Sequence, residues 1–185
     1  MKKKINKWAL ALTKRNRKMS YVKIWIHAVW GTKNRLPILS KEKRHELFVH
    51  IKENAKQKEI YIDLINGYVD HVHCLLALNA DMSISKTIGL IKGESSFWAN
   101  KRRIFDHKFE WADEYFAVSV SDSALEKVRA YILNQEEHHK KKTFSDECSE
   151  FLKANGFEVT AEANTNTIDE IPAINGRVTK SVSEI

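Results

Sequence analysis

Two histidines alternate with apolar residues in the segment Asp70-His71-Val72-His73-Cys74. On a β-strand, residues i and i+2 project to the same face, so His71 and His73 can offer two imidazole nitrogens to one metal ion. Two histidines without a cysteine cluster argue against a closed structural zinc site, which needs four ligands. The alternative, two histidines that merely lie on the polar face of a strand, stays open when this segment is taken alone. The intervening positions form an apolar opposite face that suits a core: Val72, Cys74, Leu76 and Leu78.

Tyr131 and Gln135 stand four residues apart in a segment with the apolar spacing of a helix. Residues i and i+4 lie on one face of a helix, so the phenol and the amide would be neighbours. The alternative is a boundary tyrosine with one hydrogen bond and a solvated glutamine, and the helix alone does not decide between the two. Both residues fall at the edge of the stripe expected to face the core: Leu125, Val128 and Ile132.

Two histidines and three lysines end the same segment, as His138-His139 followed by Lys140-Lys141-Lys142. One interpretation is a helix end that binds phosphate. The other is a basic C-terminus that complements the helix dipole. Both interpretations stay open at this point.

The histidine pair and the tyrosine together supply what cleavage of a phosphodiester requires, namely a nucleophile, neutralisation of charge and orientation of the scissile group. A tyrosine hydroxyl can attack phosphorus and leave a covalent phosphotyrosine, which stores the energy of the bond and permits rejoining. A divalent ion held by two imidazoles and an amide oxygen keeps positions free for phosphate oxygens. Such a mixed set of ligands suits Mg²⁺ or Mn²⁺, and Mn²⁺ is the better match to imidazole.

The elements that must position these residues follow the order β-α-β-β-α-β-α. Alternating and β-branched stretches predict strands over 21–30, 60–69, 71–78 and 115–120. Helices are predicted from Ser40 to about residue 58, from Ser83 or Ser85 to about residue 100, and from 121–123 to about residue 141. Ser123 and Glu126 could form a capping box in the last helix. The hairpin within this order predicts an α+β fold with antiparallel strands.

The net charge of +7 is distributed unevenly along the chain. Residues 1–18 carry eight basic and no acidic residues, 19–144 carry 20 basic and 16 acidic, and 145–185 carry three basic and eight acidic. The high pI is therefore partly due to the N-terminal segment and is weak support for nucleic-acid binding. We expect a flexible basic extension at 1–18, one domain at 19–144, and an acidic, partly disordered tail at 145–185.

No stretch of the chain has the length and apolar character of a membrane span, and the apolar stretch near the N-terminus is too short for a signal peptide. Cys74 and Cys148 form neither a disulfide framework nor a metal-binding pattern. We therefore expect a protein of the reducing cytoplasm with no membrane partner.

These motifs resemble those of one family. His71-Val72-His73 resembles the HUH motif, in which two histidines flank a hydrophobic residue, and Tyr131 with Gln135 resembles the catalytic helix of the single-tyrosine HUH transposases. These are the TnpA-type enzymes of the smallest bacterial insertion sequences, with the REP-associated tyrosine transposases as relatives. The likeness covers about 21–144 and includes four further segments: Ile26 to Lys33, Gly67 to His73, Ile91 to Ser96 and Tyr131 to His139.

The resemblance implies a ferredoxin-like or RRM-like HUH fold with a central antiparallel sheet. It implies a bacterial enzyme that cuts and rejoins single-stranded DNA, often with hairpins at the element ends, through a 5′-phosphotyrosine on Tyr131. His71, His73 and Gln135 would hold Mg²⁺ or Mn²⁺. It also implies a homodimer with composite active sites, in which the tyrosine helix of one protomer serves the metal site of the other, although related single-tyrosine proteins act as monomers.

Two rival functions stay open, a non-catalytic or domesticated nucleic-acid-binding protein and a small metal hydrolase that leaves no covalent adduct. Tyr115 is the alternative nucleophile, but it stands where a strand is expected to begin and has no ligand partner at helical spacing. Nine basic residues are candidates for DNA contact by location: Lys33, Arg35, Lys92, Lys101, Arg102, Arg103, Lys140, Lys141 and Lys142.

Overall fold

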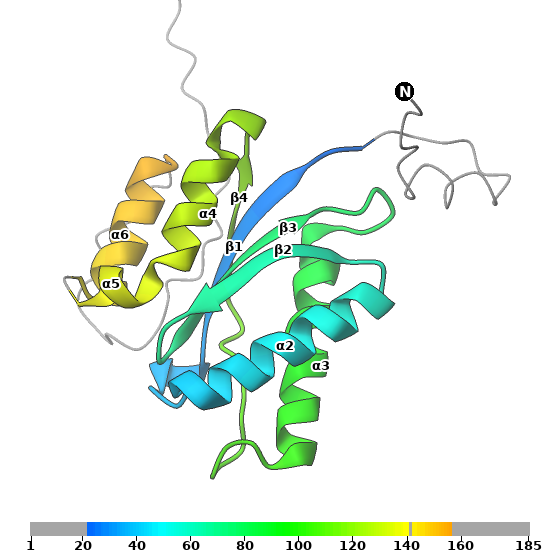
Figure 1. The fold of residues 1–185 in the computed structure, drawn as a ribbon, viewed down its shortest axis with the longest axis vertical. Coiled ribbons are helices and arrows are strands. Elements are labelled where there is room, and N and C mark those ends of the chain that lie inside the picture. The colour runs from blue at the N-terminus through cyan, green and yellow to red at the C-terminus, as the bar shows by residue number, and fades with distance from the viewer. Residues whose placement is uncertain (1–21, 141, 157–185) are drawn as a thin grey trace, which may run out of the picture.

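Four antiparallel strands form a central sheet in the order β2-β3-β1-β4 (Figure 1). The computed structural model describes residues 22–140 and 142–156. The sequence therefore predicted the class correctly, an α+β fold built on an antiparallel sheet. The strands have these bounds: β1 Trp25–Gly31, β2 Tyr61–Gly67, β3 His71–Ala77 and β4 Phe116–Val120.

Helices cover both faces of this sheet (Figure 1). One layer holds α2, Lys41–Gln57, and α3, Ile84–Arg102. The other holds α4, Leu125–Leu133, α5, Gln135–His139, and α6, Phe144–Ala154. Two short 3-10 helices, η1 at Lys33–Arg35 and η2 at Asp122–Ala124, follow β1 and β4. In the part of the chain that the structure describes, no helix is long and apolar enough to cross a membrane.

The alternation along β3 separates the two layers, as the sequence predicted. Val72, Cys74 and Leu76 join the main core beneath α2 and α3. The intervening side chains, His71 and His73, point to the other layer, where the next residue of the series, Leu75, packs with Leu125 and Ile132. The pleat of one strand therefore gives an apolar core on one side and delivers two imidazoles to the other.

The first two helices begin at the predicted serines. The Ser40 side chain accepts a hydrogen bond from the Lys43 backbone N–H, and the Ser83 side chain accepts one from Lys86. Each cap satisfies a backbone donor that the first helical turn leaves free.

The predicted third helix is wrong in two respects. It is split into α4 and α5 at Asn134, whose φ of −93° and ψ of 20° are not helical. The Asn66 amide of β2 donates to the carbonyl oxygens of Ile132 and Leu133, at 2.8 and 3.2 Å, and so satisfies acceptors that the interruption exposes. No capping box forms, because Glu126 pairs with Arg129 instead.

One described helix, α6, was absent from the sequence prediction. α6 lies where we expected the acidic tail, and it carries a capping box between Thr143 and Asp146. Its residues Phe144 and Leu152 pack against Val29 of β1 and Phe116 of β4. That the domain ends at residue 144 stays a prediction. The flexible extension expected at 1–18 and the tail expected at 157–185 lie outside the described residues.

Gly67 closes β2 where the chain approaches β3 most tightly. A Cβ added at this position would overlap the carbonyl oxygen of His71 and crowd Val72. The hairpin therefore requires glycine here because the two backbones leave no room for a side chain.

Candidate active site

The two histidines of β3 lie fully buried on the face covered by α4, α5 and α6. His73 stands opposite Val29 of β1 and Asn66 of β2, at the centre of the sheet. Burial lowers the pKa of both imidazoles, and for His73 the pKa falls well below its usual value. Both rings are therefore neutral at pH 7, which is the form that binds a metal ion.

Each of these rings is oriented by a partner at its Nδ1 atom. Asp70 places a carboxylate oxygen 2.7 Å from Nδ1 of His71, and the same carboxylate is paired with Arg35. His27 of β1 places its Nε2 atom 3.1 Å from Nδ1 of His73. With Nδ1 occupied on both rings, the Nε2 atoms are the ones that face the rest of the site, and that of His73 has no hydrogen-bond partner, an arrangement found around metal-binding histidines.

The structure brings all four predicted site residues together. Gln135 is buried, and its Oε1 atom lies 3.4 Å from Nε2 of His71. The Tyr131 ring lies 5.5 Å from the His73 ring, centre to centre. Tyr115 instead packs against the core beneath α2 and α3, on the other layer of the fold. These contacts are all made within one chain.

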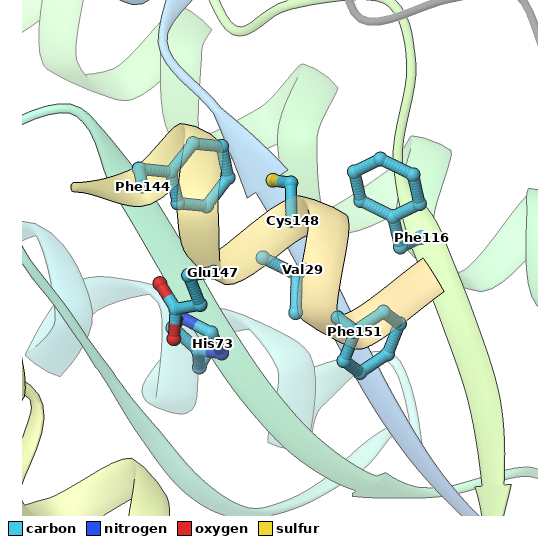
Figure 2. A pocket seen from close by; sticks show the side chains of 7 residues that line it. All are labelled: Val29, His73, Phe116, Phe144, Glu147, Cys148 and Phe151. Carbon is cyan, nitrogen blue, oxygen red and sulfur yellow. Dashed lines mark ion pairs between the residues drawn. The ribbon is translucent and has the colours of Figure 1, made fainter. Parts of the chain in front are cut away.

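Glu147 of α6 is the principal residue that the sequence analysis missed. Its carboxylate accepts a hydrogen bond from the Tyr131 hydroxyl and lies 3.6 Å from Nε2 of His71 and 3.4 Å from Nε2 of His73. Figure 2 shows it directly against His73, among the apolar side chains of α6. Burial raises the pKa of this carboxyl to about 8. An acidic residue in an expected tail carried no signal that could have marked it.

Two further histidines complete the polar cluster. His139 places Nε2 at 3.0 Å from Nε2 of His71 and 3.1 Å from Oε1 of Gln135, and burial lowers its pKa to about 4. His138 lies 3.7 Å from the Glu147 carboxylate. The His138-His139 pair therefore belongs to this cluster in the structure, and the interpretation as a dipole-complementing terminus alone is incomplete.

The residues present fit a divalent cation. Nε2 of His73 and Oε2 of Glu147 are buried and have no hydrogen-bond partner, although both are strong polar atoms. Ligand atoms of His71, His73 and Glu147 all lie within 4.8 Å of one another. Buried polar atoms are rarely left unpaired, and a cation between them would satisfy both. The set of imidazole nitrogens and oxygens suits Mn²⁺ or Mg²⁺.

Tyr131 is reached through an open groove of about 710 Å³ between β4, α4 and α6. The groove wall includes His27, Tyr131, His138 and Glu147 at its inner end and Lys127 further out. Tyr131 is therefore open to a substrate that enters the groove, whereas His71 and His73 are buried and do not line it.

The nine basic candidates fall into two groups. Five are held by partners within the chain: Lys33 by Glu110, Arg35 by Asp70, Lys140 by Glu137, Lys142 by Glu150, and Lys92 by the backbone carbonyls of Asp113 and Glu114. Lys101, Arg102 and Arg103 are exposed and form no ion pair with any residue in 22–140 or 142–156. Lys141 lies outside the described residues.

Comparison with known proteins gives concordant matches. The family described as "Transposase IS200 like" matches residues 20–135. The chain is 28% identical over 120 residues to the transposases for insertion sequence element IS200 of Salmonella typhimurium and Salmonella typhi, covering 62% of this chain and 78% of each relative. A solved structure of a candidate transposase from Deinococcus radiodurans R1 has a TM-score of 0.50 at 26% identity, covering 66% of this chain and 98% of that one. A REP-associated tyrosine transposase bound to a REP hairpin has a TM-score of 0.47 at 15% identity, covering 67% and 74%.

Proposed function

Because the chain belongs to the family of IS200-like transposases, we propose that it cuts and rejoins single-stranded DNA at the ends of an insertion sequence. The observation that carries the proposal is the position of Tyr131, which lines the open groove while its hydroxyl bonds to Glu147 and its ring lies beside that of His73. We propose that the reaction takes place in the bacterial cytoplasm, where the chromosomal DNA lies.

The chemistry is a transfer of a phosphodiester to tyrosine and back. The Tyr131 oxygen attacks the scissile phosphorus, the bond from phosphorus to the 3′ oxygen breaks, and the product is a 5′-phosphotyrosine with a free 3′-hydroxyl. When Glu147 is ionised, the phenolic proton would pass to its carboxylate along the hydrogen bond that Tyr131 donates, and the departing 3′ oxygen would take up a proton from water. Rejoining is the reverse attack by a 3′-hydroxyl. No external energy source is needed because the phosphotyrosine retains the energy of the broken bond.

His71, His73 and Gln135 are the residues that we propose to hold Mg²⁺ or Mn²⁺ in this reaction. When bound, the ion would neutralise phosphate charge and orient the scissile group. Asp70 accepts a hydrogen bond from Nδ1 of His71 and so favours the tautomer that a metal ion requires, and His27 orients the His73 ring through its contact at Nδ1.

The surface at the end of α3 is the part that we propose to contact DNA away from the groove. Phe97 is 66% exposed, and Lys101 lies 6.0 Å from the centre of its ring. Together with Arg102, which lies 6.0 Å from the centre of the Trp98 ring, and Arg103, this surface offers a stacking platform beside three exposed cations, which is how proteins hold single strands without reading sequence. For the basic residues that are held by partners within the chain, contact with DNA stays a prediction.

The resemblance implied a homodimer with composite active sites. We retain the homodimer as a proposal, but Tyr131 reaches His73 of its own chain. We therefore propose that a site assembled within one chain is a competent form of the enzyme.

A covalent adduct tests the proposed function directly. Single-stranded oligonucleotides that cover the DNA flanking the gene are mixed with the protein in Mn²⁺ or Mg²⁺, and the products are separated under denaturing conditions. We expect a DNA-linked protein band, with the nucleotide on the peptide that contains Tyr131 by mass spectrometry. DNA binding without an adduct would favour the non-catalytic alternative, and cleavage without an adduct would favour a metal hydrolase.

A further inference from the structure

Glu147 lies outside the segment that matches the family, twelve residues beyond Gln135, yet it occupies the centre of the site. It is only 4% exposed, and no lysine or arginine forms an ion pair with it among the residues that the structure describes. A buried carboxylate without a cationic partner is costly, and a metal ion is one of the few groups that removes the cost.

The two oxygens of this carboxylate face different groups. Oε1 accepts the hydrogen bond from Tyr131. Oε2 has no hydrogen-bond partner and lies 3.6 Å from Nε2 of His71. Nε2 of His73, also unpartnered, lies 3.4 Å from Oε1. Ligand atoms of all three residues thus lie within 4.8 Å of one another, and Nε2 of His71 also contacts His139 and Gln135.

We infer that Glu147 is a further, charged ligand of the metal ion that we propose His71, His73 and Gln135 to hold, and that its second oxygen holds the Tyr131 hydroxyl. This rests on the proposed function, since it adds a charged ligand to the ion that His71 and His73 hold. An anionic ligand attracts a divalent cation more strongly than the neutral amide of Gln135 does. The shared carboxylate also fixes the nucleophile at a set position relative to the ion.

The fold explains how α6 delivers this group. Phe144 stacks on His71 with ring centres 4.2 Å apart, and the Arg35 guanidinium lies 3.6 Å from the Phe144 ring centre. Phe151, one helical turn beyond Glu147, packs against His27 with ring centres 5.6 Å apart. Glu147 is therefore held between two aromatic anchors that dock on the site's own residues.

The test is Mn²⁺ binding, measured by calorimetry in the absence of DNA. We expect Glu147→Gln, which preserves shape, to weaken Mn²⁺ binding at least tenfold. Glu150→Gln is the matched control on the same helix, because Glu150 is exposed and paired with Lys142, and it should bind within twofold of wild type. His71→Ala should lose binding as well. Thermal unfolding in EDTA checks that each variant is folded.

Anomalous diffraction from crystals of the wild-type protein in Mn²⁺ tests the same claim without any substitution. The peak should lie within about 2.2 Å of a Glu147 oxygen and of Nε2 of both histidines. Glu147→Gln with unchanged Mn²⁺ affinity, or a peak away from Glu147, would overturn the inference while leaving adduct formation by Tyr131 intact. If Mn²⁺ binds through Glu147 but no covalent DNA adduct forms on Tyr131, the inference is supported and the proposed function is contradicted. A wild-type protein that binds no Mn²⁺ would overturn the inference together with the metal part of the proposal.

Discussion

The hydroxyl of Tyr131 donates a hydrogen bond to the carboxylate of Glu147, sixteen residues further along the chain. This bond joins α4 to α6 across the face of the sheet that carries the two histidines of the proposed metal site. It ties the position of the proposed nucleophile to a helix that lies beyond the family-matched segment. Any substitution at either residue therefore tests both chemistry and packing.

Tyr131→Phe should abolish the covalent adduct while DNA binding stays within about threefold of wild type. The substitution removes one oxygen and one hydrogen bond, so we expect a loss of only about 1 kcal/mol in the free energy of unfolding. Tyr115→Phe is the matched control, because Tyr115 packs on the other layer of the fold, and it should form adduct at the wild-type rate. Denaturing electrophoresis and urea unfolding measure the two effects. An adduct formed by Tyr131→Phe would exclude Tyr131 as the nucleophile.

Mixing Tyr131→Phe with His71→Ala should not restore adduct formation. Each variant lacks one half of a site whose halves meet within a single chain. The measurement is adduct formation by the mixture, after exchange of subunits has been demonstrated with differently sized chains. Recovery toward one quarter to one half of wild-type activity would instead show that Tyr131 of one protomer serves the histidines of another.

The β3 strand shows why much of the site could be predicted from sequence. The period of two in a strand sets His71 and His73 on one face and Val72 and Cys74 on the other, whatever the rest of the fold does. The helical period places Gln135 next to Tyr131 in the same way, although the chain breaks its helix between them at Asn134. Local periodicity is thus sufficient for pairs of residues that belong to one element.

The remaining site residues depend on how separate elements pack. His27 meets His73 only because β1 pairs with β3 in the register that sets Val29 opposite His73. Glu147 reaches the same point only because Phe144 and Phe151 dock α6 against the sheet. Neither the register of two distant strands nor the docking of a short amphipathic helix is encoded in spacing along the chain. The ion pairs of Lys33 with Glu110 and of Arg35 with Asp70 are likewise contacts between residues far apart in sequence.

Gly67→Ala should destabilise the protein, whereas Gly93→Ala should stabilise it. An added methyl at Gly67 would overlap the His71 carbonyl, and the backbone of the metal-site strand would have to shift. We expect a loss of about 2 kcal/mol or more, as for other overpacked sites, together with weaker Mn²⁺ binding. At Gly93, in the middle of α3, a methyl meets nothing within 4 Å, and a gain of about 0.5–1 kcal/mol is expected from helix propensity. Urea unfolding compares the two, and a Gly67→Ala variant as stable as wild type would show that the hairpin can relax at no cost.

Phe97→Ala should weaken the binding of single-stranded DNA by about 5- to 100-fold, the effect of losing one stacked base. Replacing Lys101, Arg102 and Arg103 together by Gln should lower the slope of log affinity against log salt by about 2, since each cation neutralises one phosphate. Val49→Ala and Lys86→Gln are matched controls, as both are exposed and lie elsewhere on the same helical layer. Fluorescence anisotropy over a salt series gives both quantities. Equal losses in the controls would mean that the effect is not specific to this surface.

The stability of the metal-free protein should pass through a maximum near pH 7. Burial lowers the pKa of His27 and His139 to about 4 and lowers those of His71 and His73, so the unfolded chain binds protons that the folded chain does not. Stability therefore rises as the pH increases from about 4 to 7. Burial raises the pKa of Glu147 from 4.5 to about 8, so the folded chain keeps a proton that the unfolded chain releases, and this contribution falls as the pH rises toward 8.

Between about pH 4.5 and 7 the four histidines outweigh the one carboxyl. Above about pH 7.5 the titration of Glu147 dominates, because few histidines of the unfolded chain are still protonated there. We expect the free energy of unfolding in EDTA to fall by about 0.5–1 kcal/mol between pH 7 and 9, since one proton contributes at most about 1.4 kcal/mol per pH unit and the last histidines of the unfolded chain offset part of it. Glu147→Gln cannot ionise, so it should keep the rise below pH 7 and lose the fall above it. Glu150→Gln should behave like wild type, because Glu150 is exposed. Urea unfolding at closely spaced pH values measures the profile, and a wild-type profile without a fall from pH 7 to 9 would show that Glu147 is already ionised in the folded, metal-free state.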